Sequence, residues 1–172
     1  MEERMENYLQ QCKELSLTAR LAIALLIFEK YCKNHKLKDS LIDELSDYLW
    51  KWPLIDGVEQ FNSWEQSRPQ LVNFGLGDKA SDKLKSILEF SDVNQSAFRG
   101  IVSSIVEILW VSFWGAAEDD LSIQALSTVI KSSKLSILPP LTPFKFSQFC
   151  DGNGWGKKVF KEDCDFWRHS FE

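Results

Sequence analysis

The residues with the clearest potential for chemistry lie in one glycine-rich segment near the C-terminus, residues 151–162. Aligned with the calcium loop of an EF-hand, Asp151 and Asn153 occupy positions 1 and 3, Gly156 the glycine turn at position 6, and Glu162 the bidentate position 12. Carboxylate and amide oxygens at these spacings are ligands that Ca²⁺ prefers. The segment therefore suggests a calcium site as one hypothesis.

Other residues of the same segment disfavour metal or phosphate binding. Trp155 falls at loop position 5, where it offers no oxygen ligand, and Lys158 follows at position 8. A phosphate-binding loop would need glycine at residue 151 and serine or threonine at residue 158, and Gly75 with Gly77 is too little for a dinucleotide fingerprint. Asp-Gly-Asn-Gly is typical of tight turns, because Asn and Gly tolerate positive φ, and we favour a structural turn.

Histidine and cysteine offer little for catalysis or metal binding. His35 is expected at a helix end and His169 lies near the C-terminus, and Cys32 falls on an apolar helical stripe close to His35. No Cys-x-x-Cys pair occurs, so a zinc site would need distant ligands. We expect no cofactor, no metal and no catalytic residue, and we expect all four cysteines to be reduced packing residues: Cys12, Cys32, Cys150 and Cys164.

Carboxylates form a more unusual pattern between residues 39 and 47. Asp39, Asp43 and Asp47 recur every four residues along a predicted helix, with Glu44 beside them, and only Asp47 has a lysine four residues on. One interpretation is solubility and N-terminal capping. The other is a docking face for a basic protein, since clustered charge accelerates association and sets specificity. A pair of glycosidase carboxylates is a remote third interpretation.

Tryptophan is abundant, with seven residues in the chain, and some of them are candidate interface anchors. Trp110 and Trp114 are one turn apart in a strongly apolar segment and are expected in the core. Trp50 and Trp52 are about 200° apart on a helix, so both cannot face inward, and we expect Trp50 to be exposed. Trp155, in the glycine-rich turn, is the second expected anchor.

These residues must be positioned by helices, because apolar side chains recur with helical periodicity over most of the chain. Pro53 ends one helix, a loop is expected at 72–78, and the segment 96–117 is apolar on nearly every side, which predicts a buried central helix. The predicted helices span about residues 2–14, 18–35, 40–52, 57–67, 81–90, 96–117 and 119–132.

The C-terminal part has a different character. Pro139, Pro140 and Pro143 disfavour a helix, and residues 144–149 alternate apolar and polar side chains as a strand does. We therefore expect one mainly α domain over residues 1–172, with a helical body at 1–136 built around the central helix. An extended arm at 137–172 is expected to fold back on that body, with a short hairpin as one form it could take.

Composition limits the class of protein. The 172 residues are 44% hydrophobic and 26% charged, as in a folded globular domain. The net charge of −5 argues against direct nucleic-acid binding, which needs a basic face. The N-terminus does not resemble a signal peptide, and the longest apolar runs, 21–28 and 101–114, are too short or too interrupted to span a membrane. We expect a cytoplasmic protein.

The chain resembles small bacterial immunity proteins in its size, acidity and tryptophan content, in the absence of catalytic motifs, and in the arm sequence LPPLTPFKFSQFCDGNGWG. This resemblance implies a non-catalytic inhibitor that covers the active site of a cognate basic toxin, often a nuclease, with carboxylates imitating phosphates. From the residues we expect the partner-binding set Asp39, Asp43, Glu44, Asp47, Trp50 and Trp155. The alternative is a small enzyme or regulator with a ligand or calcium site in the arm, around Asp151, Asn153, Glu162 and His169.

Overall fold

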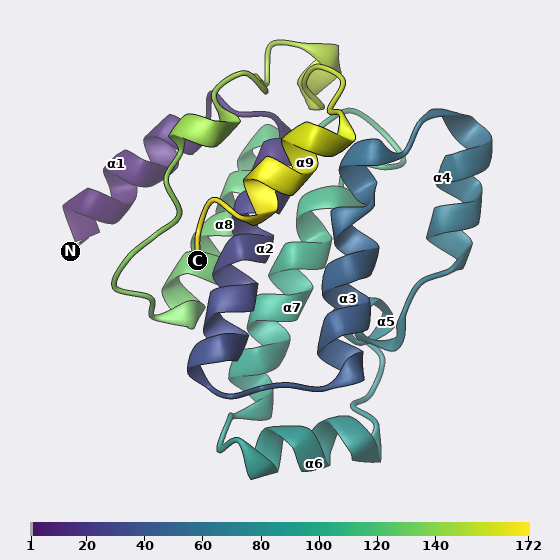
Figure 1. The fold of residues 1–172 in the computed structure, drawn as a ribbon, viewed down its shortest axis with the longest axis vertical. Coiled ribbons are helices and arrows are strands. Elements are labelled where there is room, and N and C mark those ends of the chain that lie inside the picture. Colours follow the sequence, from purple (N-terminus) through teal and green to yellow (C-terminus); the bar gives the residue numbers. More distant parts are fainter. Residues whose placement is uncertain (1) are drawn as a thin grey trace.

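The computed structural model describes residues 2–172 and confirms a mainly α fold (Figure 1). No strand occurs over those residues, and the single β-bridge joins Leu15 to Gln148. The α-helices are α1 (Glu2–Cys12), α2 (Leu17–Asn34), α3 (Ser40–Trp50), α4 (Gly57–Gln66), α5 (Gln70–Gly75), α6 (Asp82–Phe90), α7 (Gln95–Trp110), α8 (Asp119–Ser133) and α9 (Lys161–Arg168), and the short 3₁₀ helices are η1 (Trp52–Leu54), η2 (Thr142–Phe144) and η3 (Gly152–Gly154). No helix of the described part is both long and apolar enough to cross a membrane.

Helix α2 is the most completely buried element. Ser16 caps its N-terminus by accepting a hydrogen bond from the Ala19 N–H at 3.1 Å, and every residue from Leu17 to Phe28 is buried. Helices α3, α7, α8 and α9 all pack against α2. The core of the protein is therefore centred on α2, against which α8 packs most extensively and α7 next.

Helix α7 is shorter than the sequence predicted. It ends at Trp110, and residues 111–118 form a turn in which the Ser112 hydroxyl accepts a hydrogen bond from the Glu118 N–H at 2.9 Å. The expectation of a helix through residue 117 is wrong because this side-chain contact gives the backbone another partner at the helix end. As a consequence, Trp114 lies in this turn instead of in a helix, and its side chain is exposed.

Several local expectations are confirmed. The Asp39 carboxylate caps α3 by accepting from the Leu41 N–H at 3.0 Å, and Ser81 caps α6 in the same way. The loop expected at 72–78 is wrong in part, because α5 extends through Gly75. That glycine lies close under Val102 and Val106 of α7, so its backbone sits where a larger residue would crowd the helix pair.

The C-terminal arm, residues 137–172, does fold back on the body, but it is not extended and it forms no hairpin. The segment 144–149 completes the 3₁₀ turn η2 and then pairs with residues 14–16 through hydrogen bonds from Ser16 N–H to Ser147 O and from Phe149 N–H to Glu14 O. Helix α9 follows and is anchored by the fully buried Trp167, whose Nε1–H donates to the Pro143 carbonyl. The strand expectation was wrong because this pairing is limited to one isolated bridge, between Leu15 and Gln148, and the start of the segment belongs to η2.

A fully buried arginine joins α1, α2 and α8. The Arg20 guanidinium donates to the carbonyls of Cys12 at 3.1 Å and Lys13 at 2.8 Å, at the end of α1, and to the Ser122 hydroxyl at 2.7 Å. It also forms a 2.7 Å ion pair with Asp119 at the start of α8. Burial lowers the pKa of Arg20, and the Asp119 carboxylate partly opposes this effect.

Candidate functional site

The acidic stripe predicted on α3 exists, but half of it is already engaged within the protein. The Asp39 carboxylate caps α3 and lies 3.2 Å from Lys83, and these hydrogen bonds lower the pKa of Asp39. Asp47 accepts from Arg168 of α9 at 2.8 Å. Asp43 and Glu44 remain exposed. The structure therefore leaves two of the four expected carboxylates available to a partner.

Trp50 corrects the sequence prediction, because it is only 4% exposed. Its Nε1–H donates to Glu29 at 3.0 Å, and Arg168 lies over its ring at 5.8 Å while pairing with the same glutamate at 3.3 Å. The argument from helical angle failed because α3 ends at Trp50, so Trp52 belongs to η1 and both indoles can turn toward the body. Partial burial by itself lowers the pKa of Arg168, but Asp47 and Glu29 outweigh it and the net direction is upward.

The histidines and cysteines do not assemble a reactive pair. The His35 ring packs on Tyr31 with centroids 4.4 Å apart, and the exposed His169 ring contacts the Asp165 carbonyl. Burial raises the pKa of the Cys32 thiol, which makes it a poor nucleophile. All four cysteines are free thiols, and no group of three or more His, Cys, Asp or Glu side chains suited to a metal ion occurs in residues 2–172.

The glycine-rich segment at 151–156 is a turn packed against the body. The Asp151 carbonyl accepts from the N–H groups of Gly154 and Gly156, and its carboxylate lies 4.0 Å from Lys157. Gly156 has φ +86°, and a Cβ there would lie 2.5 Å from the Ser147 hydroxyl oxygen and 2.8 Å from the Cβ of Ser16. These contacts favour the structural interpretation of the segment over the calcium loop.

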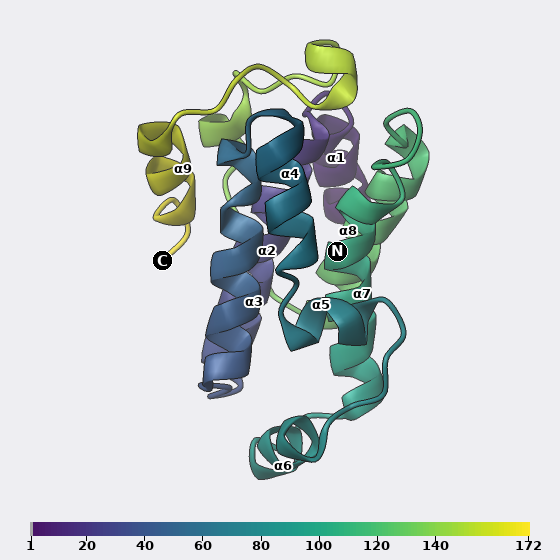
Figure 2. The ribbon, with the colours of Figure 1, turned by 90° about the vertical axis from the view of Figure 1, so that its right-hand side faces the viewer.

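Aromatic side chains that are distant in sequence converge at one end of the molecule, which we call the aromatic end face. Figure 2 shows the elements that meet there: α4, the chain between α7 and α8, and the glycine-rich turn of the arm. The Phe113 ring lies 5.1 Å from Phe61, 5.1 Å from Trp52 and 6.0 Å from Trp155, measured between ring centroids. The face consists of Trp52, Phe61, Trp64, Trp110, Phe113, Trp114 and Trp155.

This face is not fully covered by the protein. Trp114 is 75% exposed, with its ring edge-on to Phe61 at 6.1 Å. Two exposed carboxylates belong to the same elements: Glu59 lines a groove with Trp64, and Glu118 closes the turn that carries Trp114. Contiguous exposed apolar surface with a polar rim is typical of protein interaction sites. Of the residues predicted as anchors, Trp155 lies in this face, whereas Trp114, expected in the core, is the most exposed aromatic of the cluster.

A groove of about 550 Å³ continues the face between α3 and α4. Its lining includes Glu59, Trp64 and the buried Tyr48, whose ring stacks on Trp64 at 4.5 Å. The Tyr48 hydroxyl has no hydrogen-bond partner within the described chain, and burial raises its pKa. A buried polar group left without a partner is costly, so an incoming hydrogen-bonding group would be stabilised there.

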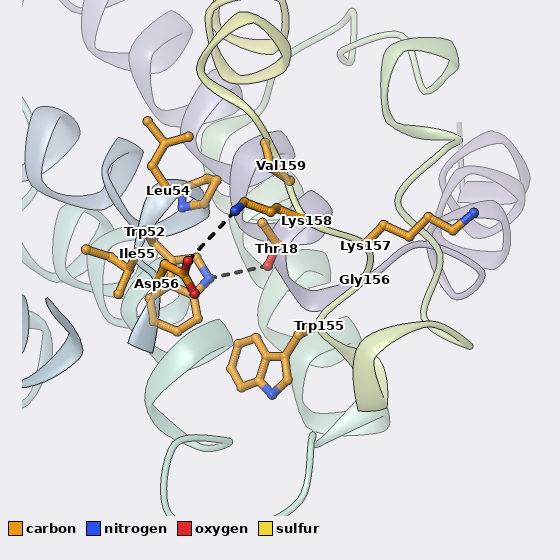
Figure 3. A pocket seen from close by; sticks show the side chains of 11 residues that line it. Thr18, Trp52, Leu54, Ile55, Asp56, Trp155, Gly156, Lys157, Lys158 and Val159 are labelled. Carbon is orange, nitrogen blue, oxygen red and sulfur yellow. Dashed lines mark hydrogen bonds and ion pairs between the residues drawn. The ribbon is translucent and has the colours of Figure 1, made fainter. Parts of the chain in front are cut away.

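A second hollow, of about 250 Å³, lies where η1 meets the arm (Figure 3). It is lined by Thr18, Trp52, Pro53, Leu54, Ile55, Asp56, Trp155, Gly156, Lys157, Lys158 and Val159. This lining includes none of the residues predicted for a ligand site in the arm, which are Asp151, Asn153, Glu162 and His169. Sequence spacing located the arm–body junction but not the side chains that form its cleft.

Comparison with known proteins adds no family to this picture: no protein-family model, curated protein or solved structure matches the chain. The candidate site is therefore defined by geometry alone. It consists of an aromatic end face with carboxylates beside it, a separate pair of free carboxylates on α3, and a small cleft next to Trp155.

Proposed function

We propose that this protein is a non-catalytic binding protein that inhibits a basic protein partner, and that the partner is a toxin of the kind neutralised by immunity proteins. The observation that carries the proposal is Trp114, 75% exposed on the aromatic end face. A single exposed apolar side chain is ordinary, but this one continues a cluster of packed aromatic rings.

The physical basis is the energetics of protein interfaces. Tryptophan and tyrosine are enriched among the few residues that supply most binding energy, and they act best at the centre of a patch from which water is excluded. Trp114 is the exposed ring of this face and packs on Phe61 and Phe113. Glu59 lines the groove beside Trp64, and Glu118 is exposed at the start of α8, so both can act as acceptors for lysine or arginine. The groove lined by Tyr48, Glu59 and Trp64 gives a partner side chain a place to enter next to this face.

The net charge of −5 supports a basic partner. Charge complementarity mainly raises the association rate and suppresses wrong partners. Asp43 and Glu44 on α3 contribute to that long-range field without belonging to the aromatic end face. A partner whose own ligand is a nucleic acid would present the lysines and arginines that these carboxylates attract.

The test begins with capture of the partner on the tagged chain from source cells at low salt, followed by affinity measurement with the purified partner. We expect Trp114→Ala to weaken binding by about tenfold or more, since truncating a central hot-spot residue costs about 2 kcal/mol. The matched control is Phe90→Ala, because Phe90 is 94% exposed on α6, at the opposite end of the molecule (Figure 1). Equal affinities of Trp114→Ala and the intact protein would overturn the assignment of this face.

A second comparison separates contact from steering. The double variant Glu59→Gln with Glu118→Gln removes rim carboxylates, whereas Asp43→Asn with Glu44→Gln removes charge from α3. We expect the first to reduce affinity and its salt dependence, and the second to slow association with little effect on dissociation. A larger affinity loss from the α3 pair would place the interface on the acidic stripe instead. A capture experiment that yields no basic protein at any salt concentration would contradict the proposed function.

A further inference from the structure

The cleft between η1 and the arm combines apolar walls with one positive and one negative group. We propose that it binds a free α-amino acid with an apolar side chain. The inference does not depend on the partner proposed above, because it concerns a different hollow and a small ligand (Figure 3).

The charged groups of the cleft come from opposite sides. Asp56 follows η1, Lys158 belongs to the arm, and their carboxylate and ammonium groups lie 3.8 Å apart across the opening. Both side chains are well exposed, Asp56 by 79% and Lys158 by 68%, so their attraction to each other is weak and costs little to rearrange. Figure 3 shows the neighbouring Lys157 directed away from this pair. The Lys157 ammonium lies 4.0 Å from the Asp151 carboxylate.

This arrangement favours a ligand with two opposite charges. A simple anion attracted by Lys158 would be repelled by Asp56, and a simple cation would meet the reverse situation. A zwitterion can lie alongside the pair with its ammonium on Asp56 and its carboxylate on Lys158, so that all four charges alternate. An α-amino acid carries its ammonium and its carboxylate on the same carbon atom, and this short separation matches that of the protein groups.

The remaining walls suit an apolar side chain. The Trp52 and Trp155 rings lie 5.2 Å apart at 56°, and Leu54, Ile55 and Val159 complete the apolar part of the lining. Trp52 is held in place by donating its Nε1–H to the Thr18 hydroxyl at 3.3 Å. The volume of about 250 Å³ is just below the range of about 300–1,000 Å³ typical of sites for larger ligands, which limits the occupant to a molecule of amino-acid size.

L-leucine is the probe, with N-acetyl-L-leucine and L-leucinamide as matched analogues that each lose one charge and keep the side chain. Binding is measured by isothermal calorimetry and by tryptophan fluorescence, since Trp52 and Trp155 line the cleft. We expect saturable binding of L-leucine and about tenfold or weaker binding of both analogues, because each leaves one charged wall unmatched.

Variants localise the effect. Asp56→Asn and Lys158→Gln should each weaken L-leucine binding by about tenfold without unfolding the protein, since both side chains are exposed. The matched controls Asp43→Asn and Lys161→Gln change the same charges outside the cleft and should retain affinity within about twofold. Absence of saturable binding at millimolar L-leucine, equal binding of either analogue, or equal effects of the control variants would each overturn the proposal. None of these outcomes bears on partner binding at Trp114, which is measured separately.

Discussion

Replacing Arg20 with methionine should destabilise this protein more than any surface charge change. Arg20 is fully buried and donates to the Cys12, Lys13 and Asp119 carbonyls and to the Ser122 hydroxyl, besides pairing with the Asp119 carboxylate. Methionine has similar length and no donors, so it would leave these acceptors buried without partners. Removing one partner of a buried charged network costs about 3–5 kcal/mol, and we expect a loss in this range.

The assay is urea unfolding followed by far-ultraviolet circular dichroism and tryptophan fluorescence, with the slope m checked for constancy. The control is Arg68→Met, because Arg68 makes only a 3.5 Å surface pair with Glu65, which should contribute less than about 1 kcal/mol. Arg20→Lys should recover only part of the loss, since an ammonium cannot reach acceptors on both sides as the guanidinium fork does. A loss below about 1 kcal/mol for Arg20→Met at unchanged m would refute the reasoning.

A double-mutant cycle identifies which contacts of Arg20 matter. The Asp119 side chain is 45% exposed, so solvent screens the ion pair, and Asp119→Asn alone should cost about 1 kcal/mol or less. Most of the Arg20→Met loss should therefore persist in the Asp119→Asn background. If Arg20→Met instead cost little stability in the Asp119→Asn background, the ion pair and not the buried carbonyls would be the dominant interaction of Arg20.

Four further predictions concern the cysteines, the glycine-rich turn and the α3 cap. Cys150 is exposed whereas burial raises the pKa of Cys164 to about 11, so iodoacetamide at pH 8 should alkylate Cys150 rapidly and Cys164 only after unfolding; equal rates would contradict the buried position. The pKa of Cys164 is higher in the folded than in the unfolded state, so the protonated thiol stabilises the fold fully below about pH 8.5. This stabilisation is lost as the pH rises toward 11, at up to about 1.4 kcal/mol per pH unit. Urea unfolding midpoints across that pH range measure the loss. Gly156→Ala should destabilise the fold by more than Gly152→Ala, since both have positive φ but only Gly156 has neighbours within 4 Å; equal thermal shifts would show that backbone strain alone matters. Asp39→Ala should reduce the free energy of unfolding by about 0.5–2 kcal/mol, because it removes the α3 cap. Since the pKa of Asp39 is lowered in the folded state, the difference in stability between the variant and the intact protein should shrink as the pH falls below about 4. A difference that stays constant with pH would argue against the cap.

The sequence alone was sufficient for the fold class and for most helices. Helical periodicity and capping depend on residues three or four positions apart, so Asp39 and Ser81 could be recognised as helix starts without any tertiary information. The prediction failed at residues 111–117, where the Ser112 hydroxyl accepts from the Glu118 N–H in a local turn. Apolar periodicity does not reveal such a side-chain contact with the backbone, which competes with the helix.

The candidate sites depended on tertiary structure to a much greater extent. The α3 carboxylates were visible in the sequence. Only the folded chain shows that Asp47 pairs with Arg168 and that Asp39 pairs with Lys83. The sequence wrongly predicted an exposed Trp50, because the helical angle says which face a residue occupies and not what covers that face. Trp155 does lie in the aromatic end face, and its role as an anchor stays a prediction.

The sequence by itself determined that this is an acidic, aromatic-rich helical protein, because composition and short-range periodicity can be read from the order of the amino acids alone. Only the tertiary structure decided that Arg20 is buried, that Trp114 is exposed, and that Trp52 and Trp155 form two walls of one cleft. Contacts between residues about a hundred positions apart are set by how whole helices pack and by how the arm returns across them. The free energy of that packing is summed over the core, and no local pattern records it.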